Sequence, residues 1–340
     1  MSESPAGTED DPSGADGPAV AVHEDVTYAS RDSGDLRLDL FVPETAGRPP
    51  LVVYVHGGGW VFETRKNAPA LQRYAAEWGV AIASVSYRLA EIPDGVAIPF
   101  DIDPENPTPR GVFPDQILDV KAAIRWLQAR AEAYGFDPDR IATWGASAGG
   151  HLALLAGFVD DVSDVAGNVY APERVEKTVA PEQSGAVQAV VDWYGVTDLT
   201  AVPVAPAGVA SLLVGGSISQ HRDRARRASP LTYVDADSPP VLVMHGRADD
   251  VVSIEQTRSL VSALRGVDLS VTSYELHGMG HVFGADSERT AMAQLTGEER
   301  PTQTVTASAS SDPGASDDRL LPAHPFAGPD AIETFLDRTL

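Results

Sequence analysis

Ser147 lies in a pentapeptide whose composition suits a nucleophile. Residues 145–149 read Gly-Ala-Ser-Ala-Gly, preceded by a short apolar run and followed by a second apolar run at residues 151–158. This order predicts a buried strand, a sharp turn and a helix, which would lift the serine hydroxyl clear of a sheet. The N-terminus of that helix would supply free N–H groups where an oxyanion forms. In isolation the pentapeptide is equally compatible with a glycine-rich turn of no catalytic role. Motifs elsewhere in the chain are therefore needed to distinguish the two interpretations.

Two later segments supply the other groups that a serine nucleophile needs. Its hydroxyl requires a base to accept the proton and an acid to fix the tautomer of that base. Asp249 lies in residues 245–252 and His281 in residues 277–281, each just after an apolar run. Because ligands of open α/β sheets bind at the carboxyl ends of the strands, the loops after three strands can meet at one site. The order serine, aspartate, histidine is that of the α/β-hydrolases.

Neighbouring side chains offer alternatives for these roles. Asp250 is the alternative acid and His277 the alternative base, although His281 is preferred because it lies at the tip of its loop. His245 is more typical of a structural hydrogen-bonding residue. His277 and His281 also have the i, i+4 spacing of metal ligands, but the glycines between them oppose a helix and no third ligand is evident. We therefore predict neither a metal site nor a cofactor.

A second glycine motif follows the apolar run at residues 51–55. Residues 56–60 read His-Gly-Gly-Gly-Trp. Consecutive glycines are costly in backbone entropy, so they indicate a place where bare backbone is needed, the alternative being a flexible turn. The N–H groups of such a loop could approach a developing negative charge.

The apolar runs alternate with amphipathic segments in β-α-β order. This order requires a parallel sheet with right-handed crossovers and predicts the α/β class, with a mostly parallel central sheet and helices on both faces. We expect strands at residues 36–42, 51–55, 80–87, 187–194, 240–244 and 269–276, and a further strand that begins at residue 141 and ends in the pentapeptide. We expect helices at residues 67–78, 114–135, 151–158, 254–264 and 330–340.

Two segments interrupt this alternation. Residues 90–111 are rich in proline and aspartate, and their apolar residues show no regular spacing. This predicts a flap or small cap over the site or, alternatively, a surface segment packed on the flank of the domain. Within them Ile98 and Phe100, together with Trp60, are the candidate substrate-binding residues. Residues 285–323 are polar and of low complexity, which predicts a disordered insertion.

Composition limits the class of protein. The 340 residues are 43% hydrophobic and suffice for a full core, which we place in one domain at residues 20–340 after a disordered acidic tail at 1–19. The absence of cysteine excludes disulfides and thiolate chemistry. A net charge of −24 opposes binding to nucleic acid or anionic membranes. No secretory signal or membrane span is evident, which favours the cytoplasm, and the oligomeric state stays open between monomer and homodimer.

The motifs together resemble the hormone-sensitive-lipase-like branch of the α/β-hydrolases, and within it the bacterial esterases grouped with feruloyl and acetyl-xylan esterases. The resemblance rests on the motifs at residues 56–60, 145–149, 245–249 and 280–281. It implies that Ser147 is the nucleophile, Asp249 the acid and His281 the base. It also implies an oxyanion hole formed by the amides of Gly58, Gly59 and Ala148.

These assignments predict a serine carboxylesterase that acts on small acyl or aryl esters without metal or cofactor. Aryl-formamidases have a similar glycine loop and are the alternative within the enzymes. A non-catalytic ligand-binding protein on the same scaffold is the alternative outside them, because a fold does not fix a function.

Overall fold

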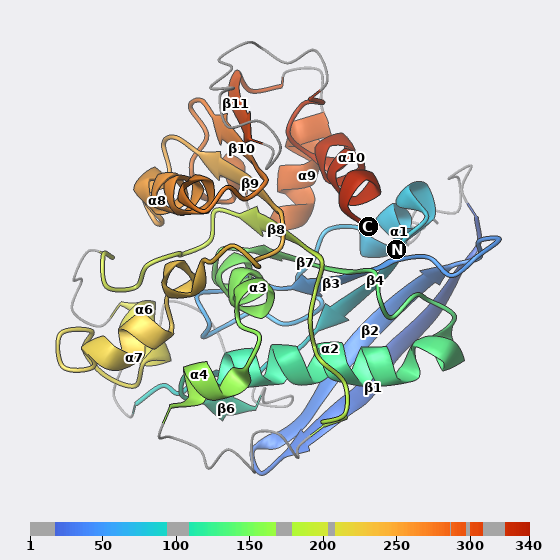
Figure 1. Ribbon diagram of the computed structural model, residues 1–340, viewed down its shortest axis with the longest axis horizontal. Coiled ribbons are helices and arrows are strands. Elements are labelled where there is room, and N and C mark those ends of the chain that lie inside the picture. Colours follow the sequence, from blue (N-terminus) through green and yellow to red (C-terminus); the bar gives the residue numbers. More distant parts are fainter. Residues whose placement is uncertain are drawn as a thin grey trace, which may run out of the picture.

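The computed structural model describes residues 18–93, 109–167, 179–202, 208–285, 287–296, 300–308 and 324–340. In this part of the chain one nine-stranded sheet has the order β1-β2-β4-β3-β7-β8-β9-β10-β11 (Figure 1). The six strands from β4 to β10 are mutually parallel, whereas β1, β2 and β11 run antiparallel to their neighbours. The α/β class with a mostly parallel sheet is therefore confirmed.

Seven strands of the large sheet follow the expected apolar runs closely, and β1 and β11 are additions to them. The strands of the large sheet are β1 (Val20–Arg31), β2 (Gly34–Pro43), β3 (Leu51–Val55), β4 (Ala81–Val85), β7 (Ile141–Ala146), β8 (Ala189–Trp193), β9 (Val241–Gly246), β10 (Val271–Leu276) and β11 (Gln303–Ser308). A small second sheet pairs β5 (Leu89–Ala90) with β6 (Arg110–Gly111).

Helices cover both faces of the sheet. They are α1 (Leu71–Trp78), α2 (Asp115–Tyr134), α3 (Ala148–Phe158), α4 (Val162–Ala166), α6 (Val209–Leu213), α7 (Arg222–Arg227), α8 (Ile254–Gly266), α9 (Glu288–Thr296) and α10 (Pro329–Thr339), with short turns η1 (Pro230–Tyr233) and η2 (His281–Gly284). The first helix begins at Leu71, four residues later than expected. No helix in the described ranges is both long and apolar enough to cross a bilayer.

Two hydrophobic cores lie on opposite faces of the sheet because side chains alternate along each strand. In β3, the side chains of Val53 and Val55 enter the core shared with α2, α3 and α8, whereas those of Val52 and Tyr54 enter the core shared with α1, α9 and α10. All five residues of β3 are fully buried. This explains why a central parallel strand appears in the sequence as an unbroken apolar run.

The expectation that residues 285–323 form a disordered insertion is wrong for two parts of that segment. Helix α9 buries Ala291, Met292 and Leu295 on one side. Strand β11 pairs antiparallel with β10, with Val305 opposite Tyr274. The threonines and serine of β11 suit an edge strand with one free side, and this polarity made the strand look like low-complexity sequence. Residues 309–323, like the tail at 1–17 and the middle of the predicted flap at 94–108, lie outside the described residues.

Candidate active site

Ser147 occupies a strained turn between β7 and α3. Its φ of 55° lies in the left-handed region, which is unfavourable for a residue with a side chain. The turn is held by hydrogen bonds from the Ser147 N–H to the Trp193 carbonyl (2.8 Å) and from the His151 N–H to the Ser147 carbonyl (3.0 Å). The sequence thus places a hydroxyl at the carboxyl edge of the sheet, as the pentapeptide predicts.

Both flanking glycines are required by close backbone contacts. A methyl group on Gly145 would overlap the carbonyl group of Gly149, and one on Gly149 would overlap the carbonyl oxygen of Val55. The second contact brings the start of α3 against the end of β3, where the glycine loop at residues 56–60 begins.

We expect Gly149→Ala to destabilise the protein by about 1–3 kcal/mol or more, because backbone atoms on both sides of the contact would have to move apart. The free energy of unfolding from urea titration would measure this loss. Gly47→Ala is the matched control, since nothing lies within 4 Å of the added methyl group there. Equal stabilities of the two variants would contradict the close crossing of α3 and β3.

The structure brings the predicted serine, histidine and aspartate together. His281 Nε2 lies 3.1 Å from Ser147 Oγ, and His281 Nδ1 lies 2.7 Å from Asp249 Oδ2. The chain of hydrogen bonds fits a neutral imidazole that donates from Nδ1 to the carboxylate and accepts from the serine hydroxyl at Nε2. His281 keeps 16% of its side chain exposed, whereas that of Asp249 is fully buried.

Asp249 is held in its ionised form by four donors. Burial alone would raise the pKa of Asp249, but hydrogen bonds from His245, His281 and the Val252 amide outweigh it and hold the pKa well below the usual range. The Val251 and Val252 amides donate to Oδ1 at 2.9 and 2.8 Å. His245 Nε2 lies 3.2 Å from Oδ2. The carboxylate is therefore fixed in orientation as well as in charge.

His245 has the structural position that its sequence context predicts. Its Nδ1 contacts the Thr257 hydroxyl at 2.7 Å and its Nε2 contacts the Val252 carbonyl at 2.9 Å. The alternative acid and base point elsewhere. Asp250 is exposed, and His277 Nε2 contacts the Thr304 hydroxyl of β11 at 2.8 Å. His277 and His281 thus serve different partners.

The glycine loop lies beside this group. Gly58 and Gly59 have φ of 85° and 57°, and a methyl group on Gly58 would overlap the Phe62 carbonyl oxygen, so the loop requires glycine there. The Val61 and Phe62 amides donate to the Gly58 carbonyl at 3.0 and 3.1 Å. The N–H of Ala148 belongs to the first turn of α3, where amides have no partner within their own helix.

Trp60 anchors the loop to α3. It is only 2% exposed, and its indole N–H donates to His151 Nδ1 at 3.1 Å. His151 Nε2 in turn contacts the Ala228 carbonyl at 2.6 Å, and burial lowers the pKa of His151 to about 4, so the ring is neutral. The structure gives Trp60 an anchoring contact and leaves little of its surface for substrate. Ile98 and Phe100, the other predicted substrate contacts, lie outside the described residues.

The two ends of the predicted flap lie against the same loop. The Ala90 amide donates to the Trp60 carbonyl at 2.6 Å, and Leu89 pairs in parallel with Arg110. The Arg110 guanidinium donates to the Val61 carbonyl at 3.3 Å. The segment at residues 90–111 therefore leaves and rejoins the domain next to the glycine loop.

Sequence reasoning missed several buried polar groups around the site. Tyr194 lies edge-on to His281, with ring centroids 4.8 Å apart. Asp192 accepts a hydrogen bond from the Gly195 amide at 3.0 Å, and burial raises its pKa to about 7. Glu63 and Glu288 lie against Gly57. Only Asp192 and Tyr194 had a local signal, because they lie in the strand expected at residues 187–194.

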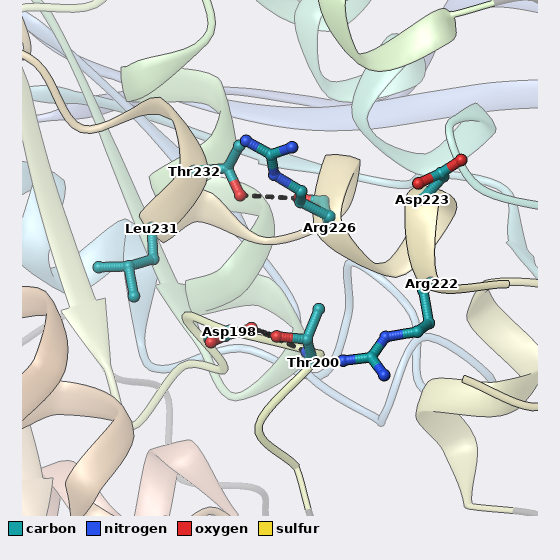
Figure 2. A pocket seen from close by; sticks show the side chains of 7 residues that line it. All are labelled: Asp198, Thr200, Arg222, Asp223, Arg226, Leu231 and Thr232. Atoms are coloured by element: carbon teal, nitrogen blue, oxygen red, sulfur yellow. Dashed lines mark hydrogen bonds between the residues drawn. The ribbon is translucent and has the colours of Figure 1, made fainter. Parts of the chain in front are cut away.

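An open cavity of about 510 Å³ lies between α7, η1 and the loop after β8 (Figure 2). None of Ser147, Asp249 and His281 lines it. Its lining residues are Asp198, Thr200, Arg222, Asp223, Arg226, Leu231 and Thr232.

The sheet has the strand order of an α/β-hydrolase, and the serine lies in the turn between β7 and α3, with the aspartate and the histidine on later loops. These features define an α/β-hydrolase of the hormone-sensitive-lipase-like type. The BD-FAE family model matches residues 38–103 and 106–264, and the chain belongs to that family.

Named relatives of this chain are ester hydrolases. It is 32% identical over 285 residues to the probable carboxylic ester hydrolase LipM of Mycobacterium tuberculosis, a match over 80% of this chain and 58% of LipM. It is 36% identical over 243 residues to the esterase LipC of the same organism, covering 69% of this chain and 53% of LipC. The chain thus spans about half the length of these curated relatives.

Among solved structures, a truncated form of a carbohydrate esterase from gut microbiota superposes with a TM-score of 0.65 and 26% identity. The match covers 80% of this chain and 95% of that esterase.

Proposed function

We propose that this protein is a serine carboxylesterase that hydrolyses small acyl or aryl esters through an acyl-enzyme intermediate. The observation that carries the proposal is the continuous hydrogen-bonded chain from Ser147 Oγ through His281 to Asp249, beside a glycine loop. The names of LipM, LipC and the carbohydrate esterase support ester hydrolysis as the class of reaction. No metal or cofactor is required by this chemistry.

The geometry suggests how each group acts. His281 Nε2 takes the proton of Ser147 as its oxygen attacks the ester carbonyl, and Asp249 stabilises the imidazolium that forms. The amides of Gly58, Gly59 and Ala148 hold the tetrahedral oxyanion. His281 then gives its proton to the leaving alkoxide. Water, activated by the same histidine, attacks the acyl-enzyme and releases the acid and free Ser147.

A substrate comparison tests this proposal against aryl-formamidase activity. We expect kcat/KM on short p-nitrophenyl esters to exceed that on N-formylkynurenine by at least about tenfold, since specificity is a ratio of kcat/KM values. Faster cleavage of the formamide would favour the formamidase. Absence of turnover together with failure of a fluorophosphonate probe to label Ser147 would favour a non-catalytic binding protein.

A further inference from the structure

Two glutamates contact the same point of the glycine loop. Glu63 follows Trp60 by three residues, and Glu288 begins α9, far away in the sequence. A methyl group on Gly57 would lie 3.2 Å from Glu288 Oε1 and 3.3 Å from Glu63 Oε2. Both carboxyl groups therefore approach the same side of Gly57, next to the proposed oxyanion hole.

Both carboxyl groups are withdrawn from water. Glu288 is 5% exposed, and Glu63 Oε2 is buried without a hydrogen-bond partner in the described part of the chain. No cation in that part forms an ion pair with either acid. The nearby Arg65 is paired with Asp25 and Asp39 instead.

Apart from His281, the other titratable groups that face this pair do not supply a positive charge. Within the described residues, the buried hydroxyls of Tyr54 and Tyr194 have no hydrogen-bond partner. The Tyr87 hydroxyl donates to the His56 and Gly57 carbonyls at 3.1 Å. Burial lowers the pKa of His56 to about 3, so this ring is neutral. His281 is the remaining group. It is hydrogen-bonded to Asp249, and its charge lowers the pKa of Glu288, but burial outweighs this effect.

Two buried, uncompensated carboxylates cannot both be charged without a large electrostatic cost. Burial, and then the charge of Glu288, raise the pKa of Glu63 to about 8, and burial also raises the pKa of Glu288. A single proton on either carboxyl group would remove the repulsion.

We propose that Glu63 and Glu288 share a proton, that this shared proton holds the glycine loop against α9, and that its loss at alkaline pH disables the esterase. This inference rests on the proposed function. Without the proton, two like charges would lie beside Gly57. They would push the loop away from α9 and oppose the negative charge that forms on the substrate oxygen. Both glutamates are positioning residues, because they act through the glycine loop.

The test compares the pH dependence of kcat in the parent, Glu63→Gln and Glu44→Gln. A glutamine amide at position 63 can donate to Glu288 as the shared proton does, but it cannot ionise. We expect the parent kcat to fall by at least about fivefold from pH 7.5 to 9.5, and that of Glu63→Gln by less than about twofold. Glu44 is exposed, so Glu44→Gln should match the parent.

Thermal stability supplies a second readout. Between the ordinary pKa of glutamate and the raised pKa of Glu63, the folded protein binds a proton that the unfolded chain has lost. The parent should therefore lose stability as pH rises from about 5 to 8, and its Tm should fall. The Tm of Glu63→Gln should fall less over this range. If the role of Glu63 were purely structural, the substitution would change Tm by the same amount at every pH and kcat by the same factor at every pH.

The inference is overturned if folded Glu63→Gln keeps the parental alkaline decline of kcat or the parental slope of Tm. If Glu63→Gln does not fold, Glu288→Gln is used as the test variant. The same smaller declines of kcat and Tm with pH are expected for it. Fluorophosphonate labelling of Ser147 in the parent separates this inference from the proposed function. A parent that is neither labelled nor active refutes the esterase, whereas a labelled, active parent with an unchanged variant profile refutes only the shared proton.

Discussion

Replacing Ser147 with alanine should lower kcat on p-nitrophenyl acetate by about 10³-fold or more. Ser147 Oγ is the atom that contacts His281 Nε2, and alanine removes it without a change in size that the turn would resist. Alanine tolerates the positive φ at this position no better and no worse than serine does. The loss should therefore appear in kcat with little change in Tm.

Ser219→Ala is the matched control, because Ser219 is exposed and hydrogen-bonds only to Ser217 among the described residues. This control should keep the parental kcat. A fluorophosphonate probe should label the parent and Ser219→Ala but leave Ser147→Ala unmodified. Near-parental turnover by Ser147→Ala, or continued labelling of it, would assign the nucleophile to another residue.

The central sheet could be predicted from the sequence because its strands are buried on both faces. Such strands form short apolar runs that end abruptly at glycine or histidine, as β3 does before residues 56–60. Each chemically active motif lies at the end of one of these runs. Parallel pairing then carries the ends to one edge, so Ser147, Asp249 and His281 could be grouped without knowledge of any contact.

Features that depend on contacts between distant segments could not be predicted in this way. Strand β11 pairs with β10 alone among the described strands, which suits its polar side chains, and its sequence alone resembles a linker. Glu63 and Glu288 are separated by most of the domain, and each is an ordinary surface residue by type. Their meeting at Gly57 follows from the packing of α9, which the sequence had placed in a disordered insertion.

The Asp249 carboxylate also controls which ring nitrogen of His281 carries a proton. Its Oδ1 accepts from the Val251 and Val252 amides, so an oxygen must occupy that position. In Asp249→Asn the amide nitrogen would consequently lie at the Oδ2 position, facing His281 Nδ1. A donor there favours the tautomer that carries its proton on Nε2. That tautomer presents a donor to Ser147 and cannot accept the serine proton.

We therefore expect Asp249→Asn to lower kcat by about 10³–10⁴-fold, although asparagine has nearly the same shape as aspartate. Steady-state kinetics on p-nitrophenyl acetate would measure the loss, and circular dichroism would show that the variant is folded. Asp250→Asn carries the same chemical change at the exposed neighbouring position and should stay within about twofold of the parent. If Asp249→Asn kept more than about a tenth of the parental kcat, the two valine amides would not be fixing the side-chain orientation, and His281 would take its tautomer from another group.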